Sequence, residues 1–143
     1  MASIAVVRLM SWKPFRSFGK GKNSRPEQKI CMEFADKLRA LELDGKLTCV
    51  WTHVPNEIGY NQNRVAQTIY AAAKAMGMIV GTSDYLFLGA TSSLAMEAKS
   101  KTGQQHQGQK DFEAWCLSKG VPYRLFRTAD EGIEILKEQG FVK

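Results

Sequence analysis

The chain has 143 residues, 44% of them hydrophobic and 24% charged, a composition typical of one soluble globular domain. No apolar run approaches the roughly 20 residues of a membrane-crossing helix, and the start of the chain is too short and poorly flanked for a signal peptide, so we expect a cytoplasmic protein. Three cysteines, widely spaced and without a CxxC pattern, favour neither a disulfide framework nor a zinc site. We expect reduced, mostly buried thiols at Cys31, Cys49 and Cys116.

The net charge of +6 is concentrated near the N-terminus. Six of the 20 basic residues lie in the first 26 residues, which hold no acid, and the other 14 are balanced by 14 acids. Basic residues interleaved with aromatics indicate either contacts to a phosphate backbone or a solvated, flexible tail, and charge alone favours neither. The sequence therefore predicts a basic N-terminal arm over residues 1–23 and a folded domain over residues 24–143.

Helical and strand patterns alternate along the rest of the chain. The expected elements are, in order, a helix over 24–41, a strand over 47–54, a helix over 61–76, strands over 84–88 and 94–99, a helix over 107–119, a strand over 122–127 and a last helix capped by Thr128. Such an order predicts an α/β fold with a mixed β-sheet flanked by helices.

Local signals add detail to these elements. Ser24 and Glu27 form a capping-box pattern at the start of the first long helix. The helix over 61–76 has an apolar face, and Gly77 is expected to end that helix. The residues of this face are Val65, Ile69, Ala72, Ala73 and Met76. Four aromatic side chains are expected in the core: Trp51, Phe112, Trp115 and Phe126.

Two acids and a lysine converge in the predicted hairpin. Strand periodicity places Glu97 and Lys99 on the same face, and hairpin pairing brings Asp84, at the start of one strand, close to both. Two convergent carboxylates suit a hard divalent cation such as Mg²⁺ or Mn²⁺, and a lysine beside the ion can orient or deprotonate water or neutralise a phosphate. The pattern is typical of phosphodiester hydrolysis.

The motif Asp…Glu-x-Lys on a hairpin resembles that of the PD-(D/E)xK nuclease superfamily. The flanking stretches resemble, in order and from about Glu27 to the C-terminus, the VRR-NUC family of virus-type replication–repair nucleases. The stretches are "HVPNEIGYNQNR", "GTSDYLFL", "LAMEAKSKTG", "QKDF", "G-x-PY" and "TADEGIEIL". One departure is Ser83, which stands where many members have a proline. The resemblance implies a restriction-endonuclease-like core.

The resemblance also implies roles for single residues. Asp84 and Glu97 would be metal ligands with the backbone carbonyl of Ala98, and Lys99 would be the catalytic lysine. Gln109, with Gln107 as the alternative in a glutamine-rich loop, would hold the attacking water or a phosphate. The remaining counterparts are Glu27 as metal support, and Asn56, Glu57 and Arg64 near the site or the DNA groove, with Lys101 as a supporting DNA contact.

Simpler interpretations exist for several of these residues. Glu97 would otherwise be a strand-edge charge paired with a nearby lysine, and Glu27 a helix cap. Glu57 would equally pair with Arg64 in a loop. We interpret His53 as a partly buried histidine with satisfied hydrogen bonds, and His106 as a possible DNA contact.

The sequence thus predicts a Mg²⁺- or Mn²⁺-dependent DNA endonuclease without an organic cofactor. The resemblance to small phage or bacterial members implies a homodimer that cleaves branched DNA such as a four-way junction, in the cytoplasm of a bacterial or phage-infected cell. The dimer contact is expected to include the apolar residues Ile4, Val6, Val7 and Leu9. Two alternatives remain: a non-catalytic module that binds branched DNA, and a nuclease that acts on flaps or on RNA.

Overall fold

The computed structural model describes residues 2–11, 25–55 and 63–143 of the chain. Contacts between Cα atoms divide the chain into two compact units. One unit comprises Met1–Val50, Ala98–Gly103 and Leu125–Lys143, and the other comprises Trp51–Glu97 and Gln104–Arg124. The expected boundary between a basic arm and a folded domain at residue 23 lies outside the described residues.

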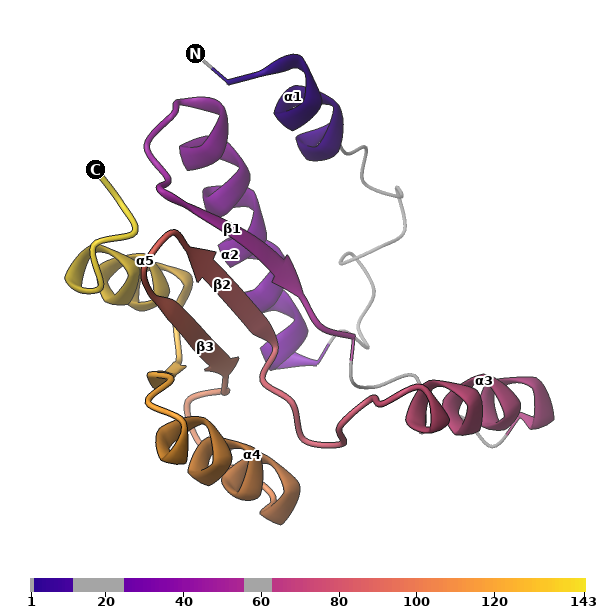
Figure 1. Cartoon of the computed structure of the whole chain (residues 1–143). Coiled ribbons are helices and arrows are strands. Elements are labelled where there is room, and N and C mark those ends of the chain that lie inside the picture. The colour runs from indigo at the N-terminus through magenta and orange to yellow at the C-terminus, as the bar shows by residue number, and fades with distance from the viewer. Residues whose placement is uncertain (1, 12–24, 56–62) are drawn as a thin grey trace. The chain divides into compact units, whose positions relative to one another are not determined.

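Four strands form one sheet in the order β1-β2-β3-β4 (Figure 1). They are β1 Cys49–His53, β2 Tyr85–Gly89, β3 Ser93–Ala98 and β4 Tyr123–Phe126. β2 and β3 form the expected antiparallel hairpin, in which Tyr85 is opposite Met96 and Leu88 is opposite Ser93. This register determines which side chains meet at the two ends of the hairpin.

β4 runs parallel to β3. The N–H of Ala95 donates to the carbonyl of Pro122, and the N–H of Lys99 donates to the carbonyl of Phe126, each at 2.9 Å, so both strands advance by four residues between the two bonds. The sheet is therefore mixed. Together with five helices in the part of the chain that the structure describes, it confirms the predicted α/β class.

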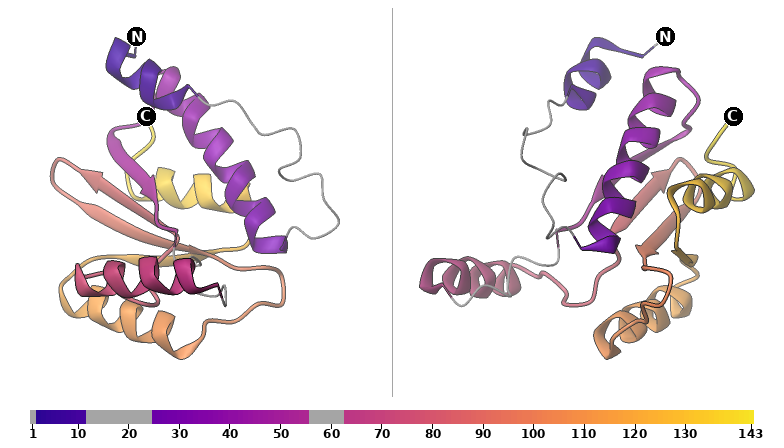
Figure 2. Two further views of the ribbon diagram at one scale, coloured as in Figure 1. Left: turned by 90° about the vertical axis from the view of Figure 1, so that its right-hand side faces the viewer. Right: turned by 180° about the vertical axis from the view of Figure 1, so that it is seen from behind.

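The first unit is built on helices α2 and α5. It contains α1 Ile4–Met10, α2 Pro26–Leu43 and α5 Ala129–Glu138. α2 and α5 pack against each other (Figure 2). The rings of Phe34 and Phe126, both fully buried, lie 4.6 Å apart between centroids. Gly132 makes this close packing possible, because a Cβ atom there would lie 2.7 Å from Cε2 of Phe34.

Two features at the N-terminal side differ from expectation. The chain forms the short helix α1, which packs on α2 and leaves Ile4, Val7 and Leu9 exposed. At the start of α2, the side chain of Gln28, not Glu27, accepts the cap hydrogen bond from the N–H of Arg25, at 3.1 Å. The expected partner Ser24 lies outside the described residues, and Glu27 bonds elsewhere.

The second unit contains α3 Arg64–Ala75 and α4 Gln107–Ser118. Gly77, with φ at +108°, follows α3 and ends it as expected. None of the residues of α3 is buried, so the apolar face of this helix is not part of the core. The prediction for Trp115 is wrong: α4 holds this indole at the surface, where it is 51% exposed.

The cysteines agree with their predicted state. All three are free; Cys49 and Cys116 are buried and Cys31 is half-buried. Burial raises the pKa of the Cys49 thiol to about 11, and the Glu42 carboxylate adds to the shift. Burial also raises the pKa of Cys116. Among the described residues, no helix combines the length and the apolar character needed to cross a membrane.

Candidate active site

The β2–β3 hairpin brings Asp84 and Glu97 together. Because Tyr85 is opposite Met96, Asp84 just before β2 lies beside Glu97 near the end of β3. The backbone N–H of Asp84 donates a hydrogen bond to Oε2 of Glu97 at 3.1 Å. The hairpin thus places two carboxyl residues at one of its ends, as the sequence pattern predicts.

Glu97 is only 2% exposed, and α4 supplies a partner for its buried carboxylate. The side-chain Nε2 of Gln109 donates a hydrogen bond to Oε1 of Glu97. Gln109 is held in turn by His106, whose N–H donates to Oε1 of Gln109 at 3.1 Å. Nδ1 of His106 accepts a hydrogen bond from the N–H of Gln109 at 3.4 Å, so His106 caps α4. The alternative glutamine, Gln107, donates instead to the Asp111 carboxylate on the surface, at 2.8 Å.

The segment that leads to Asp84 contacts the start of α4, where Gly81 of the segment lies against Gly108 of the helix. Gly81 has φ at +92°, and a Cβ atom there would lie 2.3 Å from the carbonyl carbon of Gly108. Ser83 is fully buried, and its hydroxyl donates to the carbonyl of Tyr85 at 3.1 Å. Backbone contact and a local hydrogen bond therefore fix the approach to Asp84.

Two ionisable side chains are buried at the end of β3: Glu97 lies in the strand, and Lys99 directly follows its last residue, Ala98. Lys99, two residues after Glu97 and on the same side by strand alternation, is 4% exposed. Burying a charged group is costly unless it is compensated, so such groups cluster at functional sites. The burial of both residues is the strongest local sign that this strand end serves more than packing.

The turn after Lys99 is held from two sides. The Arg127 guanidinium donates from Nη1 to the carbonyl of Ser100 at 2.5 Å and to the carbonyl of Gly103 at 2.9 Å. Oε1 of Glu27 accepts a hydrogen bond from the N–H of Ser100 at 3.4 Å. A Cβ atom at Gly103 would lie 2.9 Å from the same Glu27 oxygen. Glu27 therefore contacts this turn and does not cap its own helix.

Sequence reasoning did not single out Tyr123, which is 6% exposed. Burial raises the pKa of its hydroxyl far above the ordinary value, and the negative charge of Glu97 adds to that shift. Gln105 donates to the Tyr123 oxygen at 3.4 Å. The Gly-x-Pro-Tyr stretch, which ends in this tyrosine, was the signal that could have identified it.

His53 differs from its predicted environment. It is exposed and not partly buried, because β1 presents it to solvent at the end of the strand. Its ring meets the Tyr85 ring edge-on, with centroids 5.1 Å apart. A ring nitrogen of His53 and a carboxylate oxygen of Asp84 lie within 4.8 Å of each other. His53 thus belongs to the surroundings of Asp84.

The other expected residues lie apart from these contacts or outside the described residues. Asn56 and Glu57 are outside them, so the predicted Glu57–Arg64 pair has no structural test. Arg64 is exposed at the first position of α3, where its carbonyl accepts a hydrogen bond from the Thr68 hydroxyl at 2.9 Å. Lys101 is exposed in the turn that Arg127 holds.

The donor set fits a hard divalent cation. Asp84 and Glu97 offer carboxylate oxygens, the ligands that Mg²⁺ and Mn²⁺ prefer in proteins. A carboxylate has about four lone-pair positions, so the two hydrogen bonds that Glu97 accepts from Asp84 and Gln109 are compatible with metal ligation.

Comparison with solved structures connects the fold to a known one. The chain is similar to a structure titled "VRR_NUC domain protein", with a TM-score of 0.57, 14% sequence identity, and coverage of 81% of this chain and 88% of that one. At this identity the likeness shows the fold, which is the restriction-endonuclease-like α/β fold expected from the sequence. No family model matches the chain, and no curated protein matches it in sequence.

Proposed function

We propose that this chain is a metal-dependent nuclease that hydrolyses phosphodiester bonds in DNA. The observation that carries the proposal is the hairpin end, where a nearly fully buried Glu97 accepts the N–H of Asp84 and a buried Lys99 directly follows β3. The fold shared with the VRR_NUC domain protein supports it. A structural role alone does not explain two buried ionisable groups at the end of an apolar strand.

Asp84, Glu97 and the backbone carbonyl of Ala98 would hold one Mg²⁺ or Mn²⁺ ion, with Glu27 in support. When bound, such an ion neutralises charge on the scissile phosphate and lowers the pKa of a coordinated water. The carboxylates contribute negative charge and oxygen ligands, and the buried setting strengthens their attraction for a cation.

The chain's own groups would prepare the reaction by position and charge. Lys99 orients the attacking water and offsets the negative charge that builds on the phosphate. The water oxygen forms a bond to phosphorus as the bond to the 3′ oxygen breaks, and the departing oxygen takes up a proton. The products are a 5′ phosphate and a 3′ hydroxyl. Gln109 fixes the Glu97 carboxylate throughout.

The substrate we propose is branched DNA, such as a four-way junction, cut by a homodimer that supplies two sites. The chain has no separate module for reading base sequence, and its charge excess is confined to the N-terminal 26 residues. Arg64 and Lys101, both exposed, would contact the phosphate backbone of the DNA. Asn56 and Glu57, which lie outside the described residues, would contribute near the site or the DNA groove. Such phosphate contacts bind and orient DNA without reading its sequence.

The test is cleavage of labelled four-way junction, flap, linear duplex and RNA substrates with Mg²⁺, Mn²⁺ or EDTA. Wild type is compared with Lys99→Ala and with the matched control Lys46→Ala, an exposed lysine in the turn before β1 that has no proposed role in catalysis or DNA binding. We expect metal-dependent cutting of the junction that is lost in Lys99→Ala but retained in Lys46→Ala, with DNA binding unchanged in Lys99→Ala.

Other outcomes identify the alternatives. Binding of the junction without cutting, with every metal, contradicts catalysis and makes the chain a DNA-structure adaptor. Cutting of flaps or RNA in preference to junctions keeps the nuclease but overturns the proposed substrate.

A further inference from the structure

The exposed imidazole of His53 lies at the end of the sheet that carries Asp84. The N–H of Val54 donates a hydrogen bond to the carbonyl of Asp84 at 2.7 Å, so the chain just after β1 is paired with the chain just before β2. A ring nitrogen of His53 and a carboxylate oxygen of Asp84 lie within 4.8 Å of each other. Backbone pairing therefore brings a nitrogen donor and an oxygen donor together.

A buried neighbour restricts the ring of His53. Tyr85, the first residue of β2, is 1% exposed, and its ring meets the imidazole edge-on, with centroids 5.1 Å apart. Edge-to-face contact is a preferred geometry for two rings, so it favours one orientation of the imidazole and of its nitrogen donors. The strand presents His53 to solvent, where an ion reaches it without entering the core. His53 thus combines access with a restrained ring.

The separation of the two donors suits two ligands of one ion. Around an octahedral ion with bonds of about 2.1 Å, ligand atoms lie roughly 3 to 4 Å apart. Atoms within 4.8 Å of each other reach such a separation by small side-chain rotations. Asp84 also lies beside Glu97, whose carboxylate accepts its N–H at 3.1 Å. β1, the approach to β2, and β3 therefore each bring one donor residue to the same end of the sheet.

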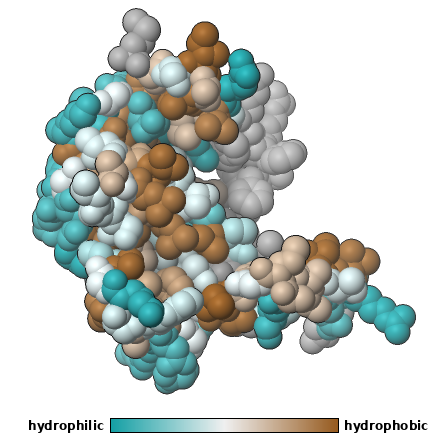
Figure 3. Space-filling model, viewed as in Figure 1, coloured by the Kyte–Doolittle hydropathy of each residue, from teal (hydrophilic) through white to brown (hydrophobic). Residues whose placement is uncertain are grey.

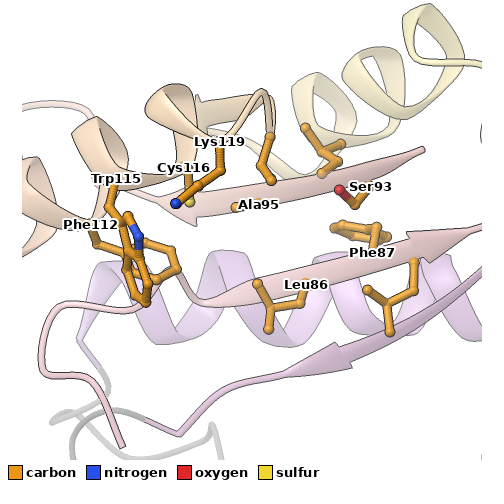
Figure 4. A pocket seen from close by; sticks show the side chains of 11 residues that line it. Leu86, Phe87, Ser93, Ala95, Phe112, Trp115, Cys116 and Lys119 are labelled. Atoms are coloured by element: carbon orange, nitrogen blue, oxygen red, sulfur yellow. The ribbon is translucent and has the colours of Figure 1, made fainter.

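Other open surfaces of the second unit offer poorer settings for a cation. α3 buries none of its residues and carries apolar side chains along its surface (Figure 3). The hollow between α4 and the hairpin, about 320 Å³ in volume, is lined mainly by apolar side chains and by no acid (Figure 4). The chain has one other histidine, His106, whose Nδ1 already accepts the N–H of Gln109. Within the described part of this unit, His53 is the histidine placed beside a proposed metal ligand.

We propose that His53 supplies a nitrogen ligand to the ion that Asp84 holds, and that this ligand makes the site prefer Mn²⁺ to Mg²⁺. The inference rests on the metal site of the proposed function and names the residue that selects the metal. Mg²⁺ is a hard cation that takes oxygen ligands, whereas imidazole nitrogen binds transition metals better. Exchange of a water ligand for imidazole therefore adds more affinity for Mn²⁺ than for Mg²⁺. Carboxylates and carbonyls alone suit both ions.

The test measures binding of Mn²⁺ alone to the full chain, without DNA. Electron paramagnetic resonance counts the free Mn²⁺, and competition with Mg²⁺ gives the affinity for the second ion. We expect wild type to bind Mn²⁺ about tenfold or more tightly than Mg²⁺. Electron spin-echo envelope modulation of the bound Mn²⁺ should show a coordinated nitrogen nucleus. A merely structural role of His53 would not produce this signal, and its detection in wild type depends on no variant.

Two variants of His53 separate the nitrogen from the position. His53→Ala is expected to remove the nitrogen signal and to weaken Mn²⁺ binding about 10- to 100-fold, with a change of less than about threefold for Mg²⁺. His53→Asp offers an oxygen in place of the nitrogen, so it should retain Mg²⁺ binding, lose the signal and reduce the preference for Mn²⁺. The matched control is Thr52→Ala, at the exposed neighbour on β1, which should change neither affinity. Circular dichroism checks that the variants are folded.

Three outcomes would overturn the role of His53: bound Mn²⁺ in wild type without a nitrogen signal, a signal that persists in His53→Ala, or equal losses of Mn²⁺ and Mg²⁺ affinity in that variant. Asp84→Asn distinguishes these from a failure of the proposed metal site. Wild type that binds no Mn²⁺, or binding that is unchanged in Asp84→Asn, contradicts the metal site itself. Binding that depends on Asp84 but not on His53 contradicts this inference alone and leaves the nuclease proposal standing.

Discussion

Arg127 holds the carbonyl oxygen of Ser100 at 2.5 Å, immediately after the buried Lys99. The same guanidinium nitrogen reaches Gly103 at the other end of the turn. An arginine presents its donors in a fixed planar arrangement, so these two hydrogen bonds restrain the backbone conformation of the turn. The conformation of the chain just beyond the proposed catalytic lysine therefore depends on a residue of the β4–α5 connection.

We predict that Arg127→Met lowers kcat for DNA cleavage about 10- to 100-fold with little change in the Kd for DNA, because small displacements of reacting groups have large effects on rate. Arg127→Lys, which keeps one charged donor, is expected to recover part of the loss. Single-turnover rates and binding isotherms measure the two effects. Arg39→Met, which removes a guanidinium paired with Asp36 on the surface of α2, is the control. Equal kcat in wild type and Arg127→Met contradicts a positioning role.

Gln109→Leu is expected to destabilise the protein by about 1–3 kcal/mol, because the buried Glu97 carboxylate loses a donor. The same change is expected to weaken metal-dependent cleavage about 10- to 100-fold, as loss of a residue that orients a ligand does. Urea unfolding and a Mg²⁺ titration of the rate measure both effects. The control is Gln107→Leu. The Gln107 side chain donates a hydrogen bond to Asp111 at the surface, so its loss should change neither the stability nor the cleavage rate.

Gly132→Ala is expected to destabilise the first unit, because the added Cβ would lie 2.7 Å from the fully buried Phe34. Overpacking costs about 1–3 kcal/mol, which exceeds the gain of up to about 1 kcal/mol from the better helix propensity of alanine. Urea unfolding measures the net loss. In a Phe34→Leu background the penalty should shrink, and an unchanged penalty in the double variant would show that the ring is not its cause.

Stability is expected to fall as the pH rises above 9, in part because of Cys49. The unfolded thiol ionises near pH 9, whereas burial raises the pKa of the folded thiol to about 11. Between these values the folded state binds more protons than the unfolded state, so each pH unit removes up to about 1.4 kcal/mol. Urea unfolding at pH 8 and pH 10, under reducing conditions, should show a smaller loss for Cys49→Ala than for wild type. Identical losses would contradict this assignment.

Much of the fold was predictable because it rests on local patterns. Alternating apolar residues, glycines at helix ends and a Thr128 cap located the strands and the helices α2 to α5, and the hairpin register placed Asp84 beside Glu97. Gln109 was singled out only through the family resemblance, as a residue that holds the attacking water or a phosphate, and its hydrogen bond to Glu97 was not predicted. All these signals act over short distances in the sequence or along one pair of strands.

What could not be predicted depends on tertiary contacts. The apolar stripe of α3 has the same periodicity as a core-facing stripe, and only the fold shows that nothing in the described chain covers it. The sequence near Glu27 offered two cap acceptors one residue apart, and Gln28 provides the cap while Glu27 bonds Ser100. The Arg127 contact joins residues 27 positions apart through backbone carbonyls, which leave no trace in side-chain patterns.

The burial of Glu97 and Lys99 at the end of a central strand has a consequence for how the proposed nuclease would evolve. Apolar side chains of similar volume often replace buried ionic groups without loss of stability, or with a gain of about 1–4 kcal/mol. Selection for folding alone would then remove these two residues, whereas selection for the proposed chemistry would retain them. A relative no longer under selection for nuclease activity would be expected to lose the buried charged residues and keep the fold. Such an inactive relative should be at least as stable as an active one.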